Sequence, residues 1–232
     1  MMTTFSQLVD VAVQETARQS LQALAVRYLN STIREVHTSA QGEPVAFGRN
    51  LVEAQLVADK STGFQWLAPV LLQQHPTVRY DSVYLDGARA YPEILPVSKI
   101  MNVREHFFYQ SGDHYIFHGY GGKGGILTLA YYLFLPRLVY YPPEERPGEF
   151  NDAGEFVLNP DFSGTEEDAL SMTTNWLLMR WPDALLEGVL AKLYKAQGED
   201  EANGRARSAF SAFERQRLQL QKIEAGVNPL GV

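Results

Sequence analysis

The residues best suited to chemistry lie in one glycine-rich stretch, GGKGG at 121–125, where a lysine stands among glycines as in phosphate-binding loops. The phosphate-loop pattern runs Gly, four further residues, Gly-Lys, and then Ser or Thr. Here Phe117 takes the place of the first glycine and Gly124 that of the Ser or Thr. Residues 119–125 contain five glycines and precede an apolar run that predicts a strand, whereas a phosphate loop precedes a helix. We therefore expect a reversing turn with a solvated Lys123.

Three histidines in the same region could bind a metal ion. His114 and His118 share one face of the predicted strand, because side chains alternate along a strand, and His106 precedes them. A zinc site needs further ligands with hydrogen-bonded support, and the chain has no cysteine to supply a thiolate. We interpret the three as surface or interface histidines, and we expect no metal and no cofactor.

Two acidic pairs could serve in acid–base catalysis, Glu144 with Glu145 and Asp183 with Glu187. Both pairs lie where solvated charges normally lie. The sequence contains no Gly-x-Ser-x-Gly, no His-Glu-x-x-His and no dinucleotide-binding fingerprint. We therefore expect no enzyme activity and no catalytic residue.

The charge of the chain is unevenly distributed. The formal net charge of −7 argues against broad electrostatic binding to nucleic acid, which needs a basic surface. Residues 144–168 contain nine acidic residues and one arginine, whereas residues 205–222 contain five basic residues and one glutamate. This asymmetry fits head-to-tail docking of one subunit on the next, or docking of the basic segment on an acidic partner. It equally fits an acidic loop and a solvated basic helix face.

Targeting signals are not evident. No apolar run reaches the roughly 18 residues of a membrane span, so we expect no membrane association. The N-terminal residues have no basic region ahead of an apolar stretch, which argues against a secretory signal. The absence of cysteine fits assembly in a reducing cytoplasm.

Residues 1–41 are predicted to be helical, because apolar residues recur at helical spacing and neither proline nor glycine interrupts them. Thr4 and Gln7 form a capping-box pattern, and Ser20 can cap a second helix. Two packed helices and one bent helix both fit this pattern.

Residues 42–141 change towards the periodicity of strands. Asp86-Gly87 is a hairpin signal, and Pro92 and Pro96 disfavour a central strand around them. Short strands are predicted at 51–58, 64–67, 77–85 and 88–94.

The stretch 107–135 predicts three more strands joined by two tight turns, a β-meander. Its last run, 126–135, has Thr128 as the only polar residue, as in a strand that is buried on both faces or covered by another subunit. Six or seven strands in all are enough for a small sandwich or a strongly bent sheet.

Residues 142–165 are rich in Pro, Gly and acid and show no regular period, so we expect a linker loop. Helix returns at Thr165, with Asp168 three residues on as a capping partner, and Pro182 fits the first turn of the next helix.

The C-terminal part is predicted to contain a polar connection at 198–204, a helix at about 205–224 and an irregular tail. One face of the last helix is expected to carry Phe210, Phe213, Leu220 and Ile223. The whole sequence therefore predicts an α+β protein. The terminal helices, 1–41 and 166–232, pack as a helical bundle, and an antiparallel β-rich, sandwich-like domain at 42–141 is inserted between them.

Three segments carry a further signal. The first is RYLNSTIREVH at 27–37, and the second is QSGDHYIFHGYGGKGGILTLAYY at 110–132. The third is TNWLLMRWPDALLEGVLAKLYKAQGEDEANGRARSAFSAFERQRLQLQ at 174–221, where a Trp-Pro-Asp step precedes two helices. In this order they resemble the head-to-tail adaptors of short-tailed phages, the tail tubular protein A family. The acidic stretch 142–168 is longer than the family pattern and could contact a tail component.

The resemblance implies a structural virion protein at the head–tail junction, assembled in the host cytoplasm. Such adaptors form a ring of about twelve copies between the portal and the tail, through which the genome passes. The implied partners are other copies of the chain, the portal protein and a tail nozzle or tail tube protein. Neither a membrane nor sequence-specific nucleic acid binding is implied.

Two sets of contact residues follow from this interpretation. Those expected to dock on the portal are Arg205, Arg207, Phe210, Phe213, Arg215, Arg217, Leu220 and Lys222. Those expected to contact a neighbouring subunit or the tail are Tyr120, Lys123, Tyr131, Tyr132, Glu144 and Glu145. The alternative is a β-rich binding module that recognises a glycan or a peptide, with Tyr131, Tyr132, Tyr140 and Tyr141 as its aromatic platform.

Overall fold

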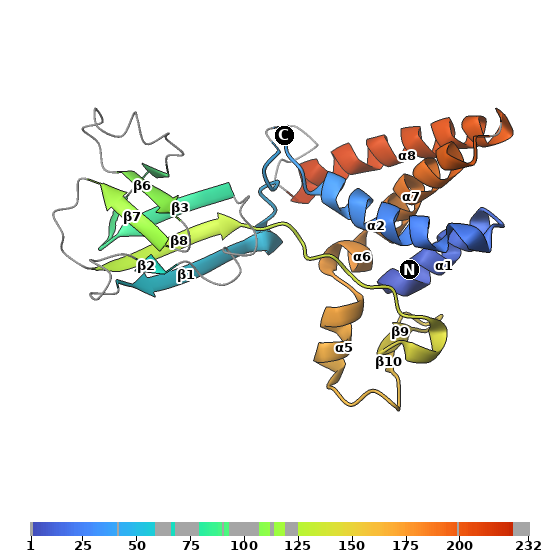
Figure 1. Ribbon diagram of the computed structural model, residues 1–232, viewed down its shortest axis with the longest axis horizontal. Helices are drawn as coiled ribbons and strands as arrows, with labels where there is room; N and C mark the ends of the chain where they lie inside the picture. Colours follow the sequence, from blue (N-terminus) through green and yellow to red (C-terminus); the bar gives the residue numbers. More distant parts are fainter. Residues whose placement is uncertain are drawn as a thin grey trace. The chain divides into compact units, whose positions relative to one another are not determined.

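The chain is an α+β protein, as predicted, and it divides into two units (Figure 1). The helical unit comprises Met1–His37 and Leu135–Val232, and the β unit comprises Thr38–Phe134. The computed structural model describes residues 2–40, 42–58, 66–67, 79–89, 91–92, 107–111, 114–118, 125–198 and 200–224.

Helix α1 (Phe5–Glu15) starts at the predicted capping box. The Gln7 backbone N–H donates to Thr4 Oγ1 at 3.3 Å, and the Thr4 N–H donates to Gln7 Oε1 at 3.0 Å. These bonds satisfy donors that the first turn would otherwise leave without partners.

Helix α2 (Gln22–Val36) is separated from α1 by a 3₁₀ turn, η1 (Gln19–Leu21), so the residues form two helices and not one bent helix. Ser20 was expected to cap α2, and this prediction is wrong. Ser20 lies inside η1, and the α2 N-cap is Leu21, without a side-chain cap bond. Continuation of the 3₁₀ turn into the helix makes a separate cap unnecessary.

Helix α5 (Glu166–Thr173) starts at a second capping box, formed by Thr165 and Asp168 as predicted. The Asp168 N–H donates to Thr165 Oγ1 at 3.2 Å, and the Thr165 N–H donates to Asp168 Oδ2 at 3.0 Å. The short α6 (Trp176–Arg180) is capped by Asn175.

Helix α7 (Pro182–Gln197) has Pro182 in its first turn, as predicted, and ends at Gly198 with φ 71°. Helix α8 (Asp200–Glu224) begins earlier than expected, so the predicted polar connection at 198–204 is wrong for most of its length. One glycine, Gly204, costs a helix about 1 kcal/mol, which packing of α8 along α7 outweighs.

Four helices, α1, α2, α7 and α8, pack on one another, and α7 contacts each of the other three. Gly188 on α7 allows α2 and α8 to pack closely against α7. A Cβ there would come within 2.5 Å of Thr32 Cγ2 and 2.9 Å of Phe213 Cδ2. Large side chains buried in this unit are Phe5, Leu29, Leu177, Leu185, Leu193, Phe213 and Leu220.

The predicted linker at 142–165 is not without regular structure. It contains a 3₁₀ turn, η4 (Pro143–Glu145), and an antiparallel hairpin of β9 (Gly148–Phe150) and β10 (Phe156–Leu158). Three-residue strands are too short to show a period in the sequence. Long-range bonds hold the hairpin, since Gln7 Nε2 donates to the Phe150 carbonyl at 2.7 Å.

In the β unit, the first sheet has the order β1-β8-β3-β4. After the 3₁₀ turn η2 (Gly48–Asn50), β1 (Leu51–Val57) pairs antiparallel with β8 (Ile126–Tyr132). On its other side β8 pairs antiparallel with β3 (Arg79–Leu85), which leads into β4 (Ala88–Arg89).

The turn between β3 and β4 is the predicted Asp86-Gly87 hairpin, with φ 49° and 80° at the two residues. Asp86 Oδ1 accepts a 2.8 Å hydrogen bond from the Ile126 N–H, which ties the turn to the start of β8. Gly125 lies against this carboxylate, at a place where a Cβ would collide with it.

The second sheet has the order β2-β7-β6-β5. It consists of β2 (Trp66–Leu67), β5 (Tyr91–Pro92), β6 (Phe107–Ser111) and β7 (His114–His118). Strand β5, with Pro92, lies at the edge of this sheet, as its missing N–H requires.

The predicted β-meander over 107–135 is wrong in its last step. Strands β6 and β7 pair antiparallel, but β8 lies in the other sheet between β1 and β3. A central strand with neighbours on both sides accounts for the almost continuous apolar run of β8. The sequence indicated the strand but could not specify its partners.

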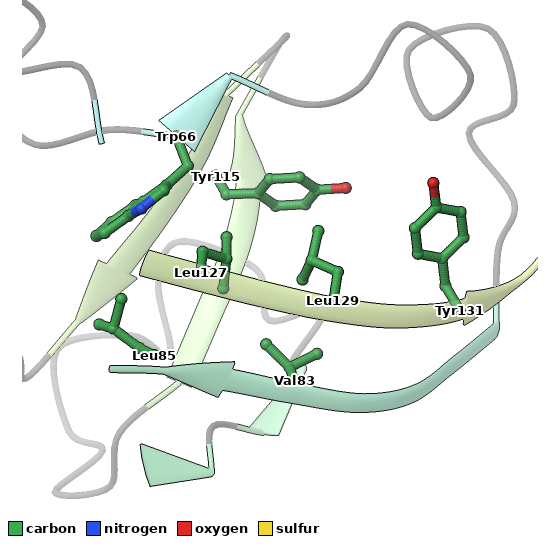
Figure 2. Close-up of a cluster of buried hydrophobic side chains, with 7 residues drawn as sticks. All are labelled: Trp66, Val83, Leu85, Tyr115, Leu127, Leu129 and Tyr131. Atoms are coloured by element: carbon green, nitrogen blue, oxygen red, sulfur yellow. The ribbon is translucent and has the colours of Figure 1, made fainter. Parts of the chain in front are cut away.

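The buried faces of the two sheets meet in one cluster (Figure 2). Tyr115 and Trp66 from the second sheet pack against leucine and valine side chains from β3 and β8. Tyr80 and Tyr115 hydroxyls lie 3.1 Å apart, and burial raises the pKa of Tyr115. The cluster consists of Trp66, Val83, Leu85, Tyr115, Leu127, Leu129 and Tyr131.

Candidate functional site

The outer face of α8 carries most of the residues that were expected to dock on the portal. Arg207, Arg215 and Lys222 are exposed, and Phe210 is 56% exposed although it is aromatic. The Arg205 guanidinium lies over the Tyr194 ring at 6.0 Å, so it is part of the α7–α8 contact as well as of the surface.

Three of the expected docking residues have roles inside the unit. Phe213 and Leu220 are buried in the helical core, at 2% and 0% exposure, and cannot meet a partner on the surface. Arg217 Nη2 forms an ion pair with Glu214 Oε2 at 2.8 Å. The helical period predicted Phe210 and Phe213 on one face, but only Phe213 is buried, where its ring lies against Gly188 of α7.

Hydrogen bonds and an ion pair also connect the C-terminal half of α8 to the rest of the helical unit. Gln221 Nε2 donates to the Val36 carbonyl at 2.8 Å, and Glu224 Oε1 lies 3.0 Å from Arg180 Nη1. Trp181 Nε1 donates to the same carboxylate oxygen at 3.3 Å. Helix α8 therefore completes the core of this unit, while Arg207, Phe210, Arg215 and Lys222 remain exposed.

A groove of about 490 Å³ runs between α7 and α8. Lys192, Lys195 and Arg207 bring positive charge to it, and Phe210 provides an exposed apolar surface. Its full lining is Glu35, Gly188, Ala191, Lys192, Lys195, Asn203, Ala206, Arg207, Phe210 and Phe213.

Lys192 connects the groove to α2. Its Nζ lies 2.7 Å from Glu35 Oε1 and donates to Thr32 Oγ1 at 3.0 Å and Ser31 Oγ at 3.2 Å. Lys195 is exposed and forms no ion pair with the residues that the structure describes. Neither lysine was among the residues expected to contact a partner, although their three-residue spacing on α7 places them on one helix face.

The acidic stretch 144–168 is more negative on its surface than its composition suggests. All nine of its acidic residues are exposed, including Glu144 and Glu145 in η4. Its one cation, Arg146, is buried, where it pairs with Asp10 of α1 and with Glu149 Oε2 at 2.8 Å. Hydrogen bonds from the Thr165 hydroxyl and N–H keep the pKa of Asp168 low, so this carboxylate stays charged.

The outer face of the β9–β10 hairpin combines this charge with an apolar side chain. Val157 is 51% exposed and is the register partner of Glu149. Glu155 directly precedes β10, is exposed, and accepts a hydrogen bond from Asn151 Nδ2 at 3.3 Å. The opposite face is aromatic, with the Phe150 and Phe156 rings 5.3 Å apart.

The remaining expected contact residues are dispersed. Tyr131 is 1% exposed and belongs to the β-unit core, whereas its neighbour Tyr132 is half-buried and donates to Asp81 Oδ1 at 3.4 Å. Tyr120 and Lys123, with most of the glycine-rich turn, lie outside the described residues. Burial of Tyr131 removes one member of the proposed aromatic platform, and Tyr140 donates to Asp10 Oδ1 at 3.0 Å.

The candidate catalytic and metal residues show little organisation. Burial and the nearby Asp183 charge raise the pKa of Glu187. His114 is half-buried on β7, the side chain of His118 lies outside the described part, and so does His106. Among the described residues, no group of three His, Asp or Glu side chains could hold a metal ion.

No protein-family model matches the chain, and no curated protein sequence matches it. In the part of the chain that the structure describes, no helix combines the length and the apolar character needed to cross a bilayer.

Proposed function

We propose that the protein is a head-to-tail adaptor, a structural virion protein that forms a ring of about twelve copies between portal and tail. The genome passes through this ring, and the partners are the portal and a tail nozzle or tail tube protein. In finer detail, we propose that the helical unit acts as a bundle and the β unit as a sandwich-like insertion.

The division of the chain into two units is the observation that carries this proposal. Both ends of the chain contribute to one helical unit, and its middle forms a separate β unit. The resemblance of the segments at 27–37, 110–132 and 174–221 implies this layout for an adaptor. Because the function of an adaptor lies in its surfaces, the proposal needs no catalytic residue.

We assign portal docking to the exposed outer face of the C-terminal half of α8, with Arg215 and Lys222 as its charges. These side chains face solvent while the helix itself stays in the core. Charges of this kind contribute more to the rate and specificity of docking than to affinity, and salt screens them.

Negative-stain microscopy of the protein mixed with its cognate portal protein tests the function. We expect rings seated on the portal. Arg215→Glu combined with Lys222→Glu should weaken docking about tenfold at low salt and less at high salt. A Ser208→Ala/Ser211→Ala control, also on the outer face, should dock normally. Failure of the wild-type protein to bind the portal would refute the proposed function.

The alternative of a glycan- or peptide-binding module has less support. Its platform required Tyr131 on the surface, and this ring is buried. A binding module of this kind would form small oligomers without portal affinity, and a glycan array would detect it.

A further inference from the structure

The α7–α8 groove has the chemistry of a docking site for an acidic, partly apolar surface. Phe210 exposes an aromatic face to water, although large apolar side chains are normally covered. Lys195 and Arg207 lie beside it in the groove lining and form no ion pair with any described residue. The groove therefore presents an apolar centre with positive charges around it.

The β9–β10 hairpin has the opposite pattern. Its outer face has Val157 as the exposed apolar centre, with Glu149 opposite in the register and Glu155 two residues before. The nearby cation, Arg146, pairs with Glu149 Oε2 at 2.8 Å and also with Asp10. One positive charge therefore meets two carboxylates, and with Glu155 the surface around Val157 keeps a net negative charge. Apolar centres with complementary charges are what two surfaces need to recognise each other.

The two surfaces cannot meet within one chain. Both belong to the helical unit, and Figure 1 shows α8 and the β9–β10 hairpin at opposite sides of it, with α1 and α2 between them. Arg146–Asp10 and Gln7–Phe150 contacts fix the hairpin to α1 on its own side. Each copy therefore displays one groove and one hairpin face on different sides.

We propose that the outer face of the β9–β10 hairpin of one copy docks in the α7–α8 groove of the next copy. Val157 packs against Phe210, and Glu149 and Glu155 face Lys195 and Arg207. This inference rests on the proposed function, since it names the contact through which copies form the ring. Two different complementary patches on one chain give a heterologous contact, which closes into a ring when the rotation allows.

Helix α8 then contacts two partners, one with each half. Arg207 and Phe210 in its first half line the groove and serve the neighbouring copy. Arg215 and Lys222 in its second half lie outside the groove lining and remain for the portal.

Disulfide crosslinking tests the contact, because the chain contains no cysteine of its own. Val157→Cys on the hairpin and Ala206→Cys in the groove replace apolar side chains and leave every charge in place. Under oxidising conditions, neither single variant should crosslink with itself, and a mixture of the two should give disulfide-linked dimers. A chain that carries both cysteines should give a ladder of larger species.

The control replaces the groove cysteine by Gln219→Cys, on exposed α8 surface outside the groove, and its mixture with Val157→Cys should stay monomeric on a non-reducing gel. Lys195→Glu combined with Arg207→Glu should abolish the crosslink, and Arg215→Glu combined with Lys222→Glu should leave it unchanged. Self-crosslinking of a single variant, or no crosslink in the mixture, would overturn the inference. Portal-bound rings without the crosslink would refute this contact alone, and crosslinked ladders without portal binding would refute the adaptor function alone.

Discussion

At the scale of single residues, Gly188 determines how closely α2 and α8 approach α7. A methyl group there would overlap the Thr32 methyl and the Phe213 ring, and both neighbours are buried. We expect Gly188→Ala to lower the free energy of unfolding by about 1–3 kcal/mol, as overpacking does elsewhere. Urea unfolding followed by circular dichroism measures this change.

The matched control for that variant is Gly204→Ala on α8. A Cβ at Gly204 meets nothing within 4 Å, and the residue is exposed in the helix. Because alanine favours helix over glycine, this variant should gain up to about 1 kcal/mol. Equal effects of the two substitutions would contradict the close packing at Gly188.

His37, at the end of α2, should make stability depend on pH. Burial, and to a smaller extent the charge of Arg34, lowers the pKa of His37 from 6.5 to about 3. Between these values the unfolded chain binds more protons than the folded one, so stability falls as pH falls below 6.5. From pH 7 to pH 5 this group alone should cost about 2 kcal/mol.

Urea unfolding of wild-type protein and His37→Gln at both pH values isolates this effect. The substitution can lower stability at either pH, but it removes the titrating group, so the loss between the two pH values should shrink by about 2 kcal/mol. An equal loss in both proteins would show that other groups govern the dependence on pH.

At the scale of elements, the β9–β10 hairpin depends on contacts with α1 that are distant in sequence. Arg146 is buried and bridges Asp10 and Glu149, and its Nε donates to the Tyr141 carbonyl at 3.4 Å. Arg146→Gln leaves Asp10 without its cation, and we expect a loss of about 1–3 kcal/mol and faster proteolysis within 147–158. Chemical unfolding and limited digestion give the two measurements.

Glu149→Gln is the control for the ion pair, because this carboxylate is 51% exposed and solvent screens it. It should cost less than about 1 kcal/mol. A loss as large as that of Arg146→Gln would mean that the hairpin depends on Glu149 and not on the bond to α1.

Local signals in the sequence predicted some element boundaries correctly, although they failed at the starts of α2 and α8. The boxes Thr4–Gln7 and Thr165–Asp168, the Pro182 start and the Asp86-Gly87 turn each depend on residues a few positions apart. The partners of β8 and the short hairpin strands could not be predicted, because strand pairing joins residues far apart in the chain. The helical period likewise predicted which residues share a face of α8. It could not predict that Phe213 is buried and Phe210 exposed, because that depends on how α8 packs in the unit.

At the scale of the whole molecule, each unit has its own core, and the chain passes between them at 37–38 and at 134–135. Leu29 and Phe213 are buried in the helical unit, and Leu129 and Tyr115 in the β unit. A unit with its own core can fold by itself. A substitution that disrupts one core should therefore unfold that unit and leave the other folded.

Leu129→Asp tests this independence. It places a charge in the β-unit cluster at a side chain with 0% exposure, and an unpaired buried charge costs several kcal/mol. We expect proteolysis of the β unit, while the helical far-ultraviolet circular dichroism of the other unit persists. Ile126→Asp, on the same strand but 51% exposed, should leave the chain intact. Leu29→Asp should instead remove most of the helical signal, and loss of that signal in Leu129→Asp would show that the two units fold as one.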